Sequence, residues 1–203
     1  MRDVETAVLV PIKSFRGAKG RLSAFFTPAE RADLSRRMAT VVLDAAAPMP
    51  VFVACDDDEV ADWVGGRGAE VLWTPDLGLN GAIEHGVEVV AGKGFSHVVI
   101  THSDIPLARS FDHLCEPGTV VLVPDHRLDG TNVQARPATA FEACYGAGSF
   151  RRHLIEALAS GHRTRVVVDA GLALDVDTID ELRDHRLSAA FTDVVARLDR
   201  EQA

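Results

Sequence analysis

The chain has 203 residues, a formal net charge of −9 and 47% hydrophobic residues. This length suits one domain with a sizeable core, and we expect a single domain over residues 1–203. The acidic balance argues against a nucleic-acid or anionic-membrane partner, because both favour a positive surface. No segment is long and apolar enough to span a bilayer, and the N-terminus lacks the apolar core of a signal peptide. The sequence therefore predicts a cytoplasmic protein.

The hydrophobic pattern alternates between strand and helix. Buried strands are predicted at residues 6–12, 50–55, 69–75, 96–104, 118–125 and 163–170. Helices are predicted at residues 27–46, 56–68, 79–94, 149–161 and 177–187, the first of them with a capping box from Thr27 to Glu30. This alternation predicts an α/β fold, a single-domain mostly parallel sheet with helices on both faces. Ligands of such sheets bind beyond the carboxyl ends of the strands.

A basic segment follows the first predicted strand. Lys13, Lys19 and Arg21 lie near Gly17 and Gly20, which let backbone N–H groups approach an anion closely. The three cations suit a triphosphate. The segment is neither a Walker A loop nor a GxGxxG turn. An ordinary solvated basic loop is an equally weighted alternative.

Acidic side chains follow two other predicted strands. Asp104 directly precedes the Ile105–Pro106 pair, and Asp175 and Asp177 point the same way along an extended segment. Carboxylates in such places hold Mg²⁺ together with substrate phosphates. A turn or cap aspartate is the common alternative. We favour Asp175 as a metal ligand and Asp177 as the cap of the last helix, with Thr178 as the other candidate cap.

Two loop-to-helix junctions carry further candidates. Asn80 and Gly81 open one predicted helix, where Asn80 suits either a cap or a base contact. Gly146 and Ser149 stand at the start of another, where a helix N-terminus with glycines and a hydroxyl favours anions. An ordinary helix with Ser149 as its cap is an equally weighted alternative. The eight histidines show no metal-binding spacing, so we expect surface or satisfied core roles. The three cysteines lie far apart, in no nucleophilic or zinc motif, so covalent catalysis is unsupported.

The ordered set of stretches resembles a known family. The stretches are "VPIKSFRGAKGRL", "TPAERADLSRRM", "GLNGAI", "HSDIPL", "DGTNV", "GAGSFRRHL" and "LALDVDT", which run across nearly the whole chain. They resemble the CofC/FbiD-type guanylyltransferases of coenzyme F420 biosynthesis. These enzymes belong to the nucleotidyltransferase superfamily with the GT-A-like, nucleotide-diphospho-sugar transferase fold.

The resemblance implies a reaction. GTP and a small phosphorylated acid react with Mg²⁺ present and release pyrophosphate; the acid is phosphoenolpyruvate, 2-phospho-L-lactate or 3-phospho-D-glycerate. The implied residues are Lys13, Lys19 and Asp104 for catalysis; Lys13, Lys19, Arg21, Asn80 and Gly81 for the nucleotide; Thr131, Gly146 and Ser149 for the acid; and Asp104, Asp175 and Asp177 for the metal. A homodimer is left open.

Two departures from the family pattern stand out. His102 and Ser103 replace a "PA"-like pair before Asp104, and "GTNVQARP" replaces a more aliphatic strand, in which Gln134 is a candidate to face the acid pocket. Three alternatives remain. One is a nucleotidyltransferase with another acceptor, such as molybdopterin, or another nucleotide, such as CTP. The second is a non-catalytic nucleotide-binding protein on the same fold. The third is a doubly wound binding domain for a different cofactor, which the missing GxGxxG motif disfavours.

Overall fold

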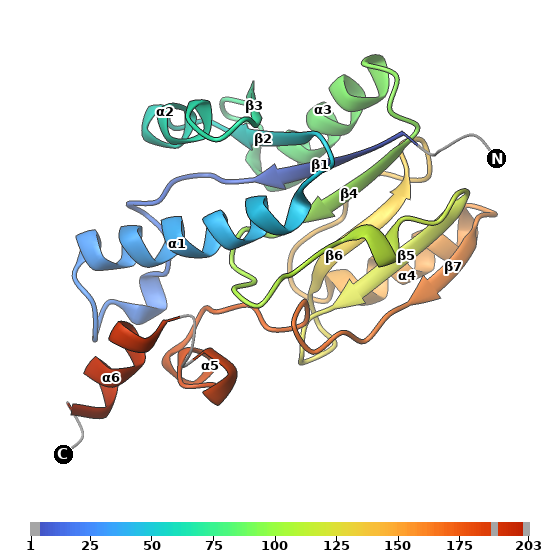
Figure 1. Ribbon diagram of the computed structural model, residues 1–203. Coiled ribbons are helices and arrows are strands. Elements are labelled where there is room, and N and C mark those ends of the chain that lie inside the picture. Colours follow the sequence, from blue (N-terminus) through green and yellow to red (C-terminus); the bar gives the residue numbers. More distant parts are fainter. Residues whose placement is uncertain (1–4, 188–190, 201–203) are drawn as a thin grey trace.

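The fold is built on one seven-stranded sheet. In the computed structural model, which describes residues 5–187 and 191–200, the strand order is β3-β2-β1-β4-β6-β5-β7 (Figure 1). The strands are β1 (Thr6–Pro11), β2 (Val51–Cys55), β3 (Glu70–Trp73), β4 (His97–Thr101), β5 (Thr119–Pro124), β6 (Thr131–Pro137) and β7 (Arg163–Val166). The β1–β2, β1–β4, β2–β3 and β5–β7 pairs are parallel, which confirms the predicted mostly parallel α/β sheet.

Helices occupy most of the predicted positions. They are α1 (Pro28–Ala46), α2 (Asp58–Gly65), α3 (Gly78–Gly92), α4 (Ser149–Ala159), α5 (Ile179–Leu182) and α6 (Thr192–Arg200), with short 3₁₀ turns η1 (Gly20–Leu22), η2 (Asp112–Leu114) and η3 (His185–Leu187). The helix expected over residues 177–187 is instead split into α5 and η3. α6 was not predicted. None of the described helices is both long and apolar enough to cross a membrane.

β6 runs antiparallel to both of its neighbours, β4 and β5. The strand pattern alone missed it, because Asn132, Gln134 and Arg136 interrupt the apolar run, whereas the family resemblance did imply a strand here. All three polar side chains are buried, and the alternate residues Val133 and Ala135 belong to the core on the other face. A central strand therefore brings polar groups into the interior.

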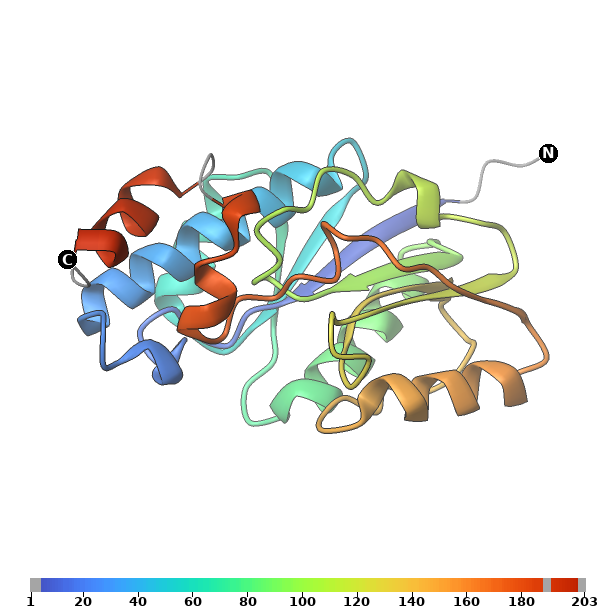
Figure 2. The same cartoon turned by 90° about the horizontal axis from the view of Figure 1, so that it is seen from below.

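Helices cover both faces of the sheet (Figure 2). On β1, Val8 and Val10 pack with the α1 and α2 side chains, while Ala7 and Leu9 pack with those of α3. This division follows from the period of two in a strand buried on both faces. α4 covers the β5 end on the same side as α3.

One predicted helix start is confirmed and three differ. Thr27 caps α1 in the predicted capping box with Glu30. Asn80, however, is not a cap, because α3 begins at Gly78 after Leu77. Gly148 rather than Ser149 is the N-cap of α4. Thr178 caps α5 through a capping box with Glu181, so the expectation that Asp177 caps this helix is wrong.

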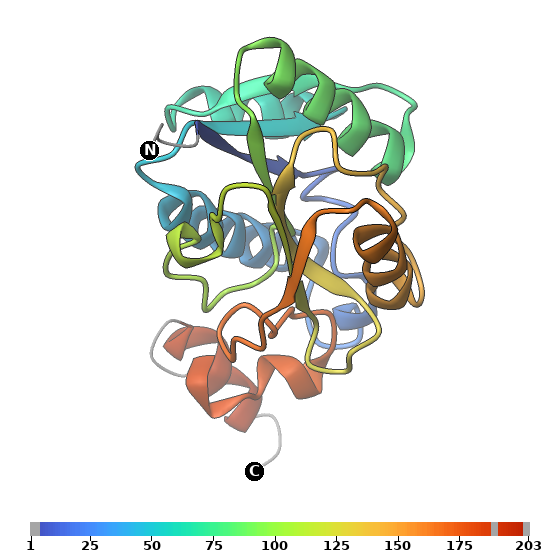
Figure 3. The same cartoon turned by 90° about the vertical axis from the view of Figure 1, so that its right-hand side faces the viewer.

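The C-terminal segment packs on the N-terminal loop and α1. One apolar cluster joins Leu22, Phe26 and Met38 to Val176 and Leu182. Figure 3 shows the C-terminal helices at one end of the molecule, beside the loop that follows β1. This packing places the stretch around Asp177 next to the basic segment.

Candidate active site

The basic loop after β1 is shaped around Lys19. This residue adopts a left-handed backbone (φ 56°) and is the N-cap of η1. Phe15 and Leu22 are buried on either side and anchor the loop in the core. Neither Gly17 nor Gly20 has a positive φ, so the left-handed residue of this loop is the lysine itself.

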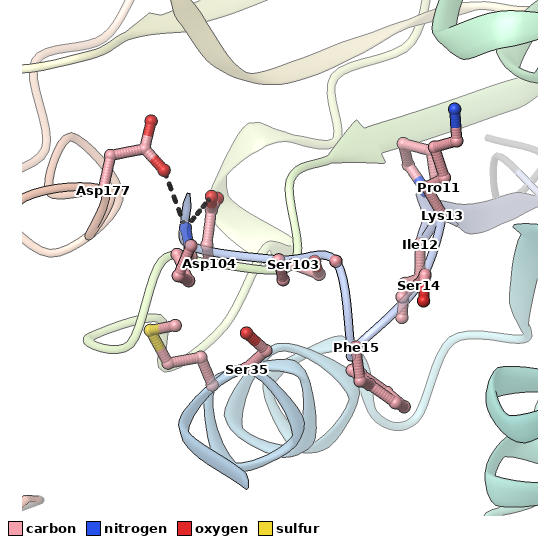
Figure 4. Close-up of a pocket in the computed structure, with 13 residues that line it drawn as sticks. Pro11, Ile12, Lys13, Ser14, Phe15, Ser35, Ser103, Asp104 and Asp177 are labelled. Carbon is pink, nitrogen blue, oxygen red and sulfur yellow. Dashed lines mark hydrogen bonds and ion pairs between the residues drawn. The ribbon is translucent and has the colours of Figure 1, made fainter. Parts of the chain in front are cut away.

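Lys19 joins two carboxylates that are distant in sequence. Its Nζ donates to Asp104 Oδ2 at 2.6 Å and to Asp177 Oδ1 at 2.9 Å. Figure 4 shows both carboxylates turned toward this one nitrogen. The Lys19 side chain is 6% exposed, against 22% for Asp104 and 43% for Asp177, so the Lys19–Asp104 contact is shielded from solvent while Asp177 is partly open to it.

The ion pair controls the charge states of its members. Burial alone lowers the pKa of Lys19, but Asp104 and Asp177 outweigh it, so the pKa lies above its ordinary value. Burial likewise raises the pKa of Asp104, yet Lys19 and then His102 bring it below its ordinary value. Both groups are therefore charged at neutral pH.

A cavity of about 500 Å³ opens beside the ion pair. Its walls come from the loop after β1, from α1, and from the segments after β4 and before α5; the lining residues include Lys13, Ser14, Lys19, Ser35, Ser103, Asp104 and Asp177. Lys13 lies across this pocket from Asp104 and Asp177 (Figure 4). The cavity thus has Lys13 on one wall and the two carboxylates, paired with Lys19, on the opposing wall.

A second, smaller cavity adjoins Lys13. Its volume is about 70 Å³, and it lies where β2 and β3 end and α3 begins, with Cys55, Thr74, Gly78 and Leu79 among its lining. Lys13 lines both cavities. The pair of cavities follows the carboxyl ends of β1, β2 and β3, the position expected for a ligand of this fold.

Arg21 lies at the edge of the site. Its Nη1 is 3.7 Å from Asp177 Oδ2, and its side chain is 69% exposed. Of the three predicted cations of the loop, Lys19 is thus engaged with carboxylates, Lys13 faces the cavities, and Arg21 is available at the rim.

Asp175 lies apart from the lysine contact. Its Oδ1 accepts from Asn132 Nδ2 at 3.3 Å, and His126 Nδ1 is 3.8 Å away. Burial raises the pKa of Asp175, and the charge of Asp104 raises it further. The structure thus brings Asp104 and Asp177 to one cation and holds Asp175 against β6.

The donor set fits a magnesium ion. Within residues 5–187 and 191–200, no group of three or more His, Cys, Asp or Glu side chains is preformed for a metal. Mg²⁺ needs only one or two carboxylates when phosphates and water complete its shell. Asp104 and Asp177 already converge on a positive charge, and Asp104 Oδ1 is buried without a hydrogen-bond partner. An unpartnered carboxylate oxygen suits a further cation ligand.

The trio predicted to bind the acid is brought together. Thr131 N donates to Ser149 Oγ at 3.1 Å, and Ser149 N donates to Gly146 O at 3.0 Å.

The start of α4 is less open to anions than predicted, because two of its amides already bind Asp129. Gly148 N donates to Asp129 Oδ2 at 3.1 Å, and Phe150 N donates to Asp129 O at 2.9 Å.

His153 was missed as a residue of this region. It is fully buried, and its Nδ1 lies 3.0 Å from Thr131 Oγ1. Cys144 N donates to its Nε2 at 3.0 Å, so Nε2 is unprotonated and Nδ1 carries the proton. Gln134, expected to face the acid pocket, is instead fully buried and contacts His153. A histidine on a helix gave no sequence signal for this role.

Asn80 and Gly81 occupy the first turn of α3. The Asn80 amide binds the main chain of Tyr145, and Gly81 packs close to Leu77. Their neighbours Gly78, Leu79 and Ala82 line the small cavity. The predicted nucleotide role of Asn80 and Gly81 stays a prediction.

Comparison with known proteins decides the family. The model of the family described as "Guanylyl transferase CofC like" matches residues 6–190. The chain belongs to this family. It is 35% identical over 202 residues to the phosphoenolpyruvate guanylyltransferase of Sphaerobacter thermophilus, covering 93% of this chain and 97% of that one. It is 32% identical to the 2-phospho-L-lactate guanylyltransferase of Methanothermobacter thermautotrophicus, covering 88% and 83% of the two chains.

Solved structures agree with the fold. A nucleotidyl transferase from Methanothermobacter superposes with a TM-score of 0.63 at 16% identity, covering 93% of this chain and 98% of that one. At this identity the likeness concerns the fold alone. The GT-A-like α/β architecture predicted from the resemblance is therefore confirmed.

Proposed function

We propose that this CofC-family protein transfers the guanylyl group of GTP to a small phosphorylated acid, with release of pyrophosphate, in coenzyme F420 biosynthesis. The observation that carries the proposal is the contact of Lys19 with Asp104 and Asp177 beside a cavity that Lys13 also lines. Family membership supports the same chemistry. The proposal places the enzyme in the cytoplasm, where GTP is available.

In the proposed reaction, a phosphate oxygen of the acid attacks the α-phosphorus of GTP. The bond between the α-phosphorus and the bridging oxygen breaks, and pyrophosphate leaves with the electron pair. No protein nucleophile is needed, since positioning and charge neutralisation supply the catalysis. The charge of the triphosphate is neutralised by Lys13, Lys19 and Arg21. Lys19 binds the leaving pyrophosphate after the lysine has separated from Asp104 and Asp177.

Asp104 and Asp177 hold Mg²⁺ in this proposal, with Asp175 as a further ligand or as support through Asn132. The bound ion stabilises negative charge on the phosphates. The small cavity beside Lys13 takes the nucleoside end of GTP. Thr131, Gly146 and Ser149 form the wall that receives the acid.

Phosphoenolpyruvate is the first choice of acid. The relative from Sphaerobacter, which matches over nearly the full length of both chains, carries that name. The three candidate acids differ by small groups, so pocket shape decides among them. 2-Phospho-L-lactate and 3-phospho-D-glycerate are the alternatives.

The experiment is pyrophosphate release with GTP and Mg²⁺, testing the three acids in parallel. We expect release with phosphoenolpyruvate, little release when CTP replaces GTP, and loss of activity with EDTA that excess Mg²⁺ restores. Release with another acid would revise the substrate only. If no pyrophosphate is released with any of the three acids while GTP still binds, the proposed function is contradicted. That result would favour another acceptor or a non-catalytic nucleotide-binding protein.

A further inference from the structure

Side chains of α3 hold the loop that carries Gly146. This loop, residues 143–147, lies between β6 and α4. Asn80 Oδ1 accepts from Tyr145 N at 2.8 Å, and Asn80 Nδ2 donates to Tyr145 O at 3.3 Å. Glu84, one turn later on the same face of α3, accepts from Ala143 N. α3 therefore binds the loop backbone at two points.

α4 holds the same loop from the other side. Arg152 donates to Cys144 O through Nε at 3.1 Å and Nη2 at 2.9 Å, and also to Ala147 O. His153 Nε2 accepts from Cys144 N. Residues on either side of Gly146 are thus bound by side chains from two helices.

The position of Gly146 depends on these contacts. Its φ of 121° lies in the region that favours glycine, and its carbonyl accepts from Ser149 N. Ser149 Oγ in turn accepts from Thr131 N. A shift of the loop would therefore change the wall formed by Thr131, Gly146 and Ser149.

Asn80 is set apart from the nucleotide cavity by what its amide does. The α3 residues that line the small cavity are Gly78, Leu79 and Ala82. The Asn80 side chain uses one lone pair of its oxygen and one of its two N–H donors on Tyr145, so half of its hydrogen-bonding capacity is engaged with this loop. It does not cap α3 either, since the cap residue is Leu77.

We propose that Asn80 is a positioning residue for the phosphorylated acid, which holds the loop of residues 143–147 in place, and that it does not bind the nucleotide. This inference rests on the proposed function. By this inference α3 contacts both substrate regions. Its first turn lines the small cavity, and the Asn80 amide binds the loop that forms part of the wall for the phosphorylated acid.

The test compares substrate constants of Asn80→Ala and Asn80→Asp with those of the wild type. Loss of both hydrogen bonds in Asn80→Ala is expected to raise the KM for the acid about tenfold and leave the KM for GTP within about twofold. Asn80→Asp keeps an acceptor for Tyr145 N but no donor for Tyr145 O, so its effect should be intermediate. The matched control is His85→Ala, an exposed position on the same helix, with both constants unchanged.

Two readouts need no turnover. Calorimetry should show GTP binding to Asn80→Ala as tight as to the wild type, and hydrogen exchange of the Tyr145 amide should be faster in the variant. Weakened GTP binding with an unchanged KM for the acid would overturn the inference and make Asn80 a nucleotide ligand. Unchanged constants with unchanged exchange would overturn it as well.

Failure of the proposed function looks different. The wild type would then release no pyrophosphate with any of the three acids, and the inference would be judged on exchange at residues 143–147 alone. Faster exchange there in Asn80→Ala than in the wild type would support the inference that Asn80 positions the loop, and unchanged exchange would overturn it. If Asn80→Ala unfolds at the assay temperature, Asn80→Asp carries the same comparison.

Discussion

At the residue scale, the site depends on a lysine placed between two carboxylates. Lys19, Asp104 and Asp177 come from three segments, and sequence reasoning had selected all three. It did not foresee that Asp177, rather than Asp175, contacts the lysine. Both acids point the same way along the chain, and only the packing of the C-terminal segment decides which one reaches the loop.

Asp104→Asn is expected to lower kcat/KM by at least about a hundredfold, because the amide removes one negative charge from the cation site. Pyrophosphate release measures this, and circular dichroism verifies that the fold is kept. Asp180→Asn, an exposed acid in the first turn of α5, is the control and should keep wild-type activity. Near-normal turnover of Asp104→Asn would remove Asp104 from the mechanism.

His153 predicts a dependence of stability on pH. Burial lowers its pKa to about 3, helped by the charges of Arg136, Arg152 and His102. Its ordinary pKa is about 6.5, so between these values the unfolded chain binds a proton that the folded protein does not. The free energy of unfolding is therefore unaffected by this group above pH 6.5, and it decreases as the pH falls from about 6.5 to about 3.

Urea unfolding of wild type and His153→Gln at several pH values between 7 and 4 checks this. The wild type should lose up to about 1.4 kcal/mol per pH unit from this one group. His153→Gln is expected to be less stable at pH 7 but to show a shallower dependence on pH. Parallel pH profiles of the two proteins would argue against a neutral buried His153.

At the element scale, patterning predicted the strands on both sides of β6 and failed at β6 itself. Apolar runs marked β1, β2, β4 and β5, whereas β6 carries buried polar residues that only its tertiary partners explain. Asn132 binds Leu172 O and Asp175, and Gln134 contacts His153. A periodicity argument detects apolar burial, so it could not find a strand whose inward side chains serve a polar site.

α3 packs closely on β1 at one glycine. A Cβ on Gly86 would lie 2.7 Å from both terminal carbons of Leu9, a fully buried side chain that would have to shift within the core. Gly86→Ala should therefore destabilise the protein by about 1–3 kcal/mol. Gly92, at the end of the same helix, has nothing within 4 Å of that position, so Gly92→Ala should be neutral or stabilising by up to about 1 kcal/mol. Urea unfolding of both variants measures the difference.

At the scale of the whole molecule, the chain divides into two consecutive groups of strands. β1 to β4 form one end of the sheet and β5 to β7 the other, and the β4–β6 ladder joins them. The fold class, the basic loop and the segment of Asp104 were predictable because these segments follow strands that patterning detects. The way the groups meet was not, since it depends on the antiparallel entry of β6.

A continuous sheet of this kind is expected to unfold in one step. Trp63 and Trp73 report on the first group of strands, and far-ultraviolet circular dichroism reports on the whole chain. Their urea transitions should coincide, because neither group can keep its β4–β6 edge paired alone. Two separated transitions would contradict the prediction of a single domain over residues 1–203.

The contact of Lys19 with Asp177 also ties the N-terminal loop to the segment that leads into α5 and α6. A ligand that binds Lys19 and separates it from Asp177 removes this contact. A ligand that is bound by the loop and by Asp177 together instead links the two segments more strongly. Protease cleavage beyond Asp177 should therefore report on occupancy. It is expected to speed up with pyrophosphate alone, which competes for the lysine, and to slow when GTP and Mg²⁺ are supplied together.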